Sequence, residues 1–155
     1  MRKRSNYRPK RKLQDPLAFV LNGFRPADQK SNGIITTVRI MNHGAINAVR
    51  TGKATWEDVS TLVVAFNVGL GLCAAGVGGD YSHELREALK AALVLEQRDK
   101  WLLTGPELSA INTGMEVHDA QLDVCTVVEM EAALVTVQQM MAERKALVRR
   151  QACTA

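Results

Sequence analysis

The densest group of side chains that could do chemistry lies between positions 116 and 125. Its carboxylates, histidine and thiol could hold a metal ion or serve as a general acid–base centre, and its members are Glu116, His118, Asp119, Asp123 and Cys125. On a helix the three carboxylates share one stripe, whereas the histidine and the thiol follow another. Tight binding needs ligands within about 2.0 to 2.3 Å of one ion, and two stripes do not converge without a second segment. The spacing therefore favours a solvated carboxylate stripe beside a partly buried histidine, with a metal or acid–base centre as the alternative.

The motifs that mark familiar enzymes are missing from the rest of the sequence. Gly69-Leu-Gly71 lacks the third glycine of a dinucleotide-binding loop, and no G-K-[ST] ending marks a P-loop, so these glycines indicate close helix packing. None of the serines has a G-x-S-x-G setting. Cys73 and Cys125 fall on apolar stripes, which is typical of unreactive core thiols. We therefore expect a protein that is not an enzyme and that has no catalytic residue, metal or cofactor.

Basic side chains at both ends of the chain could bind phosphate groups. Residues 13–142 carry a net charge of −6, whereas the first twelve residues carry +7 and residues 143–155 carry +3. The arm that could lie along a phosphate backbone, with a tyrosine to stack on a base, contains Arg2, Lys3, Arg4, Tyr7, Arg8, Lys10, Arg11 and Lys12. A possible second basic patch comprises Arg144, Lys145, Arg149 and Arg150.

Three interpretations of these basic ends are open. Contact with a polyanion, most simply nucleic acid, would show steep salt dependence and little sequence preference. Alternatively, the ends could contact an acidic protein surface, on a host protein or on a second copy of the chain, which would make the protein an adaptor or inhibitor. A passive, solubilising tail is the third interpretation.

Helices must position all of these side chains. Capping boxes beginning at Thr55, Thr104 and Thr126 each precede apolar residues at helical spacing. We expect a loop over 25–33, a cap at Asp80 or Ser82, and helices near 16–22, 36–52, 56–76, 83–99, 105–124 and 127–150. The inward face of the second helix is expected to carry Val38, Met41, Ala45 and Val49. The β-branched run over 33–38 is the one place where a strand could intrude.

The whole chain is expected to form one all-α domain, a bundle of five or six helices with a basic N-terminal arm. We place the arm at residues 1–14, the helical domain at 15–150 and a short tail at 151–155. The last two helices are expected to pair in antiparallel fashion across a corner at 124–127. Three cysteines without a metal-type or disulfide-type spacing suit the reducing cytoplasm. Since no apolar run reaches about 18 residues, we expect no membrane partner.

Four segments resemble a family of small uncharacterised proteins carried by phages and prophages of proteobacteria. They are Tyr7-Arg-Pro-Lys10, Asp15-Pro-Leu-Ala-Phe-Val-Leu-Asn-Gly23, Arg39-Ile-Met-Asn-His-Gly44 and Met115-Glu-Val-His-Asp-Ala-Gln-Leu-Asp-Val-Cys125. The resemblance implies an accessory protein that binds host machinery or nucleic acid in the host cell cytoplasm. It assigns no activity and no functional residue.

Overall fold

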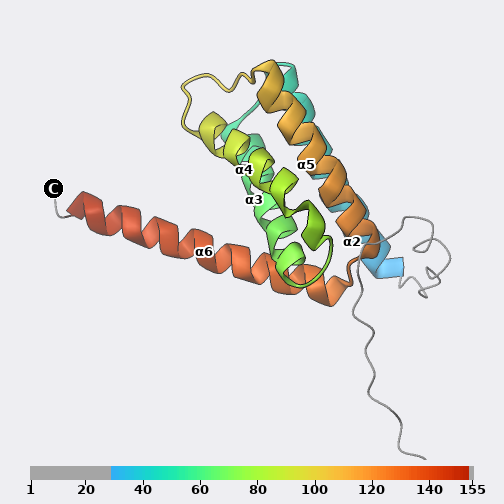
Figure 1. The fold of residues 1–155 in the computed structure, drawn as a ribbon. Coiled ribbons are helices and arrows are strands. Elements are labelled where there is room, and N and C mark those ends of the chain that lie inside the picture. The colour runs from blue at the N-terminus through green and yellow to red at the C-terminus, as the bar shows by residue number, and fades with distance from the viewer. Residues whose placement is uncertain (1–28, 154–155) are drawn as a thin grey trace, which may run out of the picture.

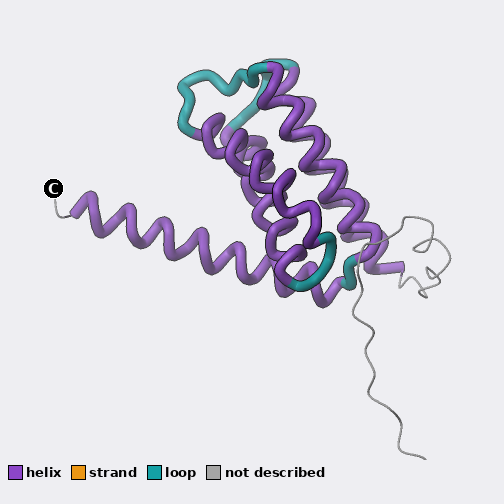
Figure 2. Tube along the Cα trace, in the orientation of Figure 1, coloured by secondary structure: helices purple, strands orange, loops and turns teal. Residues whose placement is uncertain are grey.

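The computed structural model describes residues 29–153, and helices dominate them (Figure 1). They are α2 (Gln29–Arg50), α3 (Trp56–Ala74), α4 (Ser82–Glu96), α5 (Gly105–Val124) and α6 (Val127–Cys153), with a 3₁₀ turn, η1, at Gly79–Tyr81. This part of the chain contains no strand, which confirms the all-α bundle (Figure 2). The basic arm and the helix expected over 16–22 lie outside the described residues.

Helix α2 begins earlier than the sequence pattern predicted. Residues 29–33, which we expected to be loop, are helical, and so is the β-branched run that follows them. The Thr37 hydroxyl donates a hydrogen bond to the carbonyl oxygen of Gly33 at 2.9 Å, which ties this run into the helix. The buried face also differs from the prediction: Met41 is 57% exposed, whereas Asn42 is only 4% exposed.

Capping residues set the starts of three helices as predicted. Backbone amides of Thr55, Thr104 and Thr126 each donate to the carboxylate three residues ahead, at 2.7 to 2.8 Å. Glu107, the capping carboxylate of α5, also accepts a forked hydrogen bond from Arg98, which lowers its pKa to about 2. The cap expected for α4 is wrong, because Tyr81 precedes that helix without a side-chain hydrogen bond.

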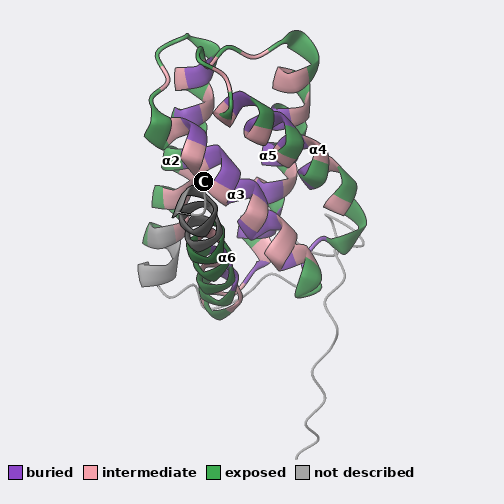
Figure 3. Ribbon diagram, turned by 90° about the vertical axis from the view of Figure 1, so that its left-hand side faces the viewer, coloured by how far each residue is buried: buried purple, intermediate pink, exposed green. Residues whose placement is uncertain are grey.

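Helix α3 lies at the centre of the packing. One apolar cluster joins it to α2, α4 and α5 around Phe66, Leu62, Leu85 and Ile111. A second cluster joins it to the end of α5 and to α6. Figure 3 shows the buried residues concentrated where the other helices enclose α3. Among the described helices, α3 alone is long and apolar enough to span a membrane by length and composition, a property that an enclosed core helix shares.

Small residues allow the helices to approach closely, as the Gly-rich stretch of α3 predicted. A Cβ added at Gly71 would lie 3.3 Å from the Cβ of Ala133 in α6. Gly114 in α5 was not singled out from the sequence, yet a Cβ there would lie 2.3 Å from the Cβ of Ala88 in α4. These glycines let helix backbones meet where larger side chains would hold them apart.

The expected antiparallel pairing of the last two helices is wrong. After a two-residue corner, in which Cys125 is extended, α6 turns away from α5 and packs mainly on α3. The α6 side chains that make this contact are buried in the second cluster and belong to Met130, Ala133 and Val137. Beyond it, α6 runs past the bundle (Figure 1). The helix reaches Cys153, so it includes three residues of the expected tail at 151–155.

Candidate functional site

The carboxylates of the suspected metal cluster form a network of ion pairs with α2. Arg39 donates to the backbone oxygen of Asp119 at 2.8 Å and forms an ion pair with Asp123. The Nε2 atom of His43 lies 2.7 Å from Oδ2 of Asp119. This network ties α2 to α5, since the carboxylates of α5 meet the guanidinium group of Arg39 and the imidazole ring of His43. Within residues 29–153, no three potential ligands of the His, Cys, Asp or Glu type gather around one point.

The remaining members of that cluster lie apart. Glu116 is exposed beside a shallow depression that also includes His43 and Asn112, whereas Cys125 is buried in the second apolar cluster. Burial raises the pKa of the Cys125 thiol to about 11, and it also raises the pKa of Cys73. Both thiols therefore stay protonated at neutral pH, in agreement with the expectation of unreactive core cysteines.

His118 lies inside the protein and forms a buried polar pair with Gln121. The side chain of His118 faces inward, as the helical spacing predicted, and the residue is only 1% exposed. Gln121 is fully buried and donates from its Nε2 atom to the carbonyl oxygens of Gly69, at 2.9 Å, and Val77, at 2.8 Å. Gln121 was not singled out from the sequence, although it lies three residues after His118 and seven after Gly114, on the same inner stripe of α5.

This pairing fixes the protonation of His118. Because the amide nitrogen of Gln121 is committed to two carbonyl groups, its Oε1 atom is the one that faces Nδ1 of His118, at 3.4 Å. An amide oxygen can only accept, so Nδ1 carries the proton. Burial lowers the pKa of His118 below its usual range because the charged ring would lose its hydration. The ring is therefore neutral at pH 7. Its Nε2 atom carries no proton and can accept a hydrogen bond.

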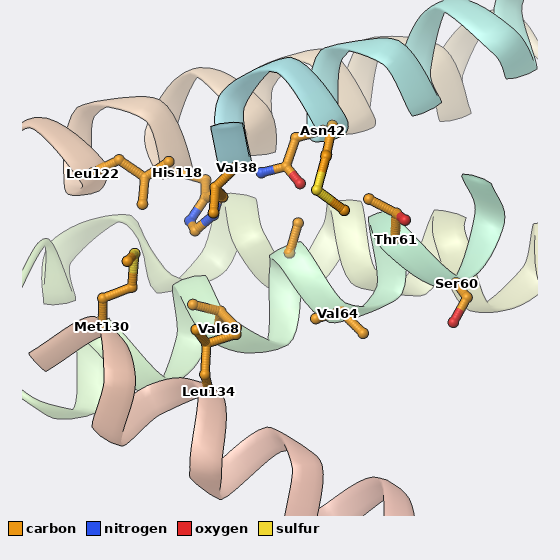
Figure 4. Close-up of a pocket in the computed structure, with 12 residues that line it drawn as sticks. Val38, Asn42, Ser60, Thr61, Val64, Val68, His118, Leu122, Met130 and Leu134 are labelled. Carbon is orange, nitrogen blue, oxygen red and sulfur yellow. The ribbon is translucent and has the colours of Figure 1, made fainter. Parts of the chain in front are cut away.

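A cavity of about 300 Å³, partly open to solvent, lies beside His118 and is lined by residues of α2, α3, α5 and α6 (Figure 4). Its wall is mostly apolar and is formed by Val38, Met41, Val64, Ala65, Val68, Leu122, Met130 and Leu134, with Asn42, Ser60, Thr61 and His118 as polar members. Figure 4 shows the Asn42 amide and the His118 ring on the same side of the cavity. The Nδ2 atom of Asn42 is buried, and it has no hydrogen-bond partner among the described residues.

A wider groove of about 800 Å³ separates α6 from the surface of α3 and α4. Its lining includes Trp56, Leu89, Leu93 and Met140, of which Trp56 and Met140 are each about half exposed. Arg144, at the rim, lies 3.4 Å from a carboxylate oxygen of Glu96. Since this ion pair is largely exposed on its arginine side, it adds little to stability.

The predicted phosphate-binding residues are only partly placed by the structure. The arm, with Arg2, Lys3, Arg4, Tyr7, Arg8, Lys10, Arg11 and Lys12, lies outside the described residues. Of the second patch, Arg144 is held at the groove by Glu96. Lys145, Arg149 and Arg150 belong to the last turns of α6. Comparison with protein-family models, curated proteins and solved structures finds no match to this chain.

Proposed function

We propose that this chain is a non-enzymatic accessory protein of the phage type that binds nucleic acid in the cytoplasm through its basic ends. The separation of charge along the chain carries the proposal. Seven cations and no anion occupy the first twelve residues, and a second basic stretch returns after residue 143. The body between them is acidic, so a polyanion meets favourable charge only at the two ends.

The course of α6 supports this division between body and ends. Its first half packs on α3, and its continuation carries the positions of Lys145, Arg149 and Arg150 past the bundle (Figure 1). Arg144 is engaged by Glu96, so we expect it to contribute less than the other cations of this stretch.

Salt-dependent binding tests the proposal. The affinity of the intact chain for a fluorescent DNA duplex should fall linearly with salt on logarithmic axes, with a slope of about −6 if all seven arm cations neutralise phosphates. Deleting residues 1–12 should remove most of that slope, and fluorescence anisotropy at several salt concentrations measures it. The same titration with single-stranded DNA and with RNA shows which nucleic acid is preferred.

A matched control distinguishes the effect of the basic ends on binding from the effect of the protein's net charge. The double variant Arg149→Gln and Arg150→Gln should reduce the slope, whereas Arg86→Gln with Lys100→Gln, which changes net charge equally on the exposed body, should not. Equal binding by the intact and truncated chains at every salt concentration would show that the arm is passive.

Protein contact is the second candidate function, and the groove beside α6 favours it. Exposed Trp56 and Met140 offer apolar area of the kind that a partner helix covers. If a protein is the ligand, removing residues 1–12 should mainly slow association, while Met140→Lys should speed dissociation. Light scattering on the intact chain shows whether a second copy is that partner.

A further inference from the structure

We propose that the cavity between α2, α3, α5 and α6 binds a neutral, mostly apolar small molecule that carries one hydroxyl group. The site is separate from the basic ends, and it does not depend on nucleic-acid binding. Three observations define the ligand: the volume of the cavity, the polar pair on one side of it, and the charge of its wall.

The volume sets the size of the ligand. The cavity measures about 300 Å³. An apolar cavity of about 150 Å³ is large enough to take up benzene, so this one suits a molecule of roughly ten to twelve non-hydrogen atoms. Its lower wall, formed by Val64, Val68 and Leu134, is aliphatic and would cover the apolar part of such a molecule (Figure 4).

The polar pair sets the functional group. Asn42 is 96% buried, and its amide nitrogen has no acceptor among the described residues, a state that folded proteins rarely leave uncompensated. His118 needs a donor instead of an acceptor. Its Nδ1 atom carries the proton and faces Gln121, so its Nε2 atom can only accept a hydrogen bond. A hydroxyl group answers both, since its oxygen accepts from Asn42 and its hydrogen is donated to His118.

The charge of the wall excludes anionic ligands. Among the described residues that line the cavity there is no arginine or lysine, and burial keeps His118 neutral. A carboxylate placed here would lose its hydration without gaining a cation, so a fatty acid should bind more weakly than the alcohol of the same length. Met41 lines the cavity and is itself 57% exposed, so the wall of the cavity reaches the protein surface at this residue.

Three probes of similar size test the inference on the full chain at pH 7.5: 4-phenylbutan-1-ol, butylbenzene and 4-phenylbutanoate. Isothermal titration calorimetry gives their affinities, and ¹H–¹⁵N NMR locates the binding. The alcohol should bind about 5- to 100-fold more tightly than the hydrocarbon, since two hydrogen bonds distinguish them, and the carboxylate should bind most weakly. Amide shifts should centre on α2 and α5 near Asn42 and His118.

Substitutions distinguish this cavity from other apolar surfaces. Asn42→Leu should reduce the preference for the alcohol by about 2- to 10-fold and leave the affinity for butylbenzene within about twofold. Asn47→Leu, an exposed site on the same helix, should change neither. Val38→Phe and Leu134→Phe each fill the cavity and should abolish binding, and circular dichroism shows which of the two is folded.

Several results would overturn the inference. They are the absence of binding by all three probes, equal affinity for alcohol and hydrocarbon, or binding that survives in a folded cavity-filling variant. Shifts centred on Trp56 and Met140 would assign the binding to the groove beside α6 instead.

Discussion

Buried polar side chains give the interior of this bundle its chemistry. Asn42, His118 and Gln121 are each at most 4% exposed, and they come from two helices that the ion pairs of Arg39 hold together. The helical spacing of α5 predicted that His118 faces inward. The same spacing turns Gln121 inward as well, but it could not predict the hydrogen bonds of Gln121, because the acceptors of its amide are the carbonyl groups of Gly69 and Val77, which are distant in the sequence.

The neutral state of His118 predicts a dependence of stability on pH. Its pKa is lower in the folded than in the unfolded state, so the unfolded chain binds the extra proton first. The contribution to stability is therefore complete above about pH 6.5 and is lost as pH falls toward the folded pKa. Urea unfolding should show a lower stability at pH 5.5 than at pH 7.5, and His118→Ala should reduce this difference.

His118→Ala also tests the metal hypothesis. At pH 7.5 the variant should be less stable than the parent chain, because it loses packing and the contact with Gln121. Elemental analysis should find no stoichiometric transition metal in either protein. A metal that is present in the parent and lost from the variant would instead make the ligand cluster of the sequence a true site.

Gln121→Leu should be among the most damaging substitutions in the protein. It preserves the approximate volume but removes the amide group that donates to the carbonyl oxygens of Gly69 and Val77 and joins α5 to them. We expect the free energy of unfolding to fall by about 2 to 4 kcal/mol, measured by urea titration. Gln138→Leu, on the exposed side of α6, is the control and should stay within about 0.5 kcal/mol of the parent.

At the scale of the elements, local signals predicted where most helices begin but not how they pack. Three threonine caps lie where the sequence placed them, since a cap depends only on residues within one turn. The direction of α6 depends on which neighbour offers a flat surface. Its apolar stripe predicts burial, but the close approach to α3, where Gly71 lies opposite Ala133, depends on residues far apart in the sequence.

Two glycine substitutions separate packing from helix propensity. Gly114→Ala would place a Cβ 2.3 Å from that of Ala88, so it should destabilise the protein by about 1 to 3 kcal/mol or more. Gly44→Ala, in the middle of α2 with nothing within 4 Å of the added Cβ, should stabilise it by up to about 1 kcal/mol. Thermal unfolding of both variants measures these effects. Similar shifts for the two would show that α4 and α5 are not closely packed at this crossing.

At the scale of the whole molecule, α3 and α5 contribute to both apolar clusters and so connect them into one unit. The composition and periodicity predicted this all-α bundle, because amphipathic helices must bury their apolar faces against one another. The charge pattern identified two basic ends, and their proposed role in binding a polyanion stays a prediction, because contacts within the described residues cannot reveal a partner.

This shared core predicts cooperative unfolding. Helix content followed by circular dichroism and tertiary packing followed by the fluorescence of Trp56 and Trp101 should give coincident urea transitions. Met130→Ala, which weakens the contact of α6 with α3, should shift both transitions together by about 2 to 4 kcal/mol. Separate midpoints would show that α6 unfolds independently of the other helices.

The central place of α3 has a consequence for the nascent chain. At usual synthesis rates of about 5 to 20 residues per second, Met130 leaves the ribosome roughly 3 to 11 seconds after the end of α3. During that interval α3, the most apolar of the helices that the structure describes, has only α2, and later α4 and α5, to cover it. A message cut short before α6 would therefore yield a fragment with an open apolar face, a natural substrate for chaperones and proteases.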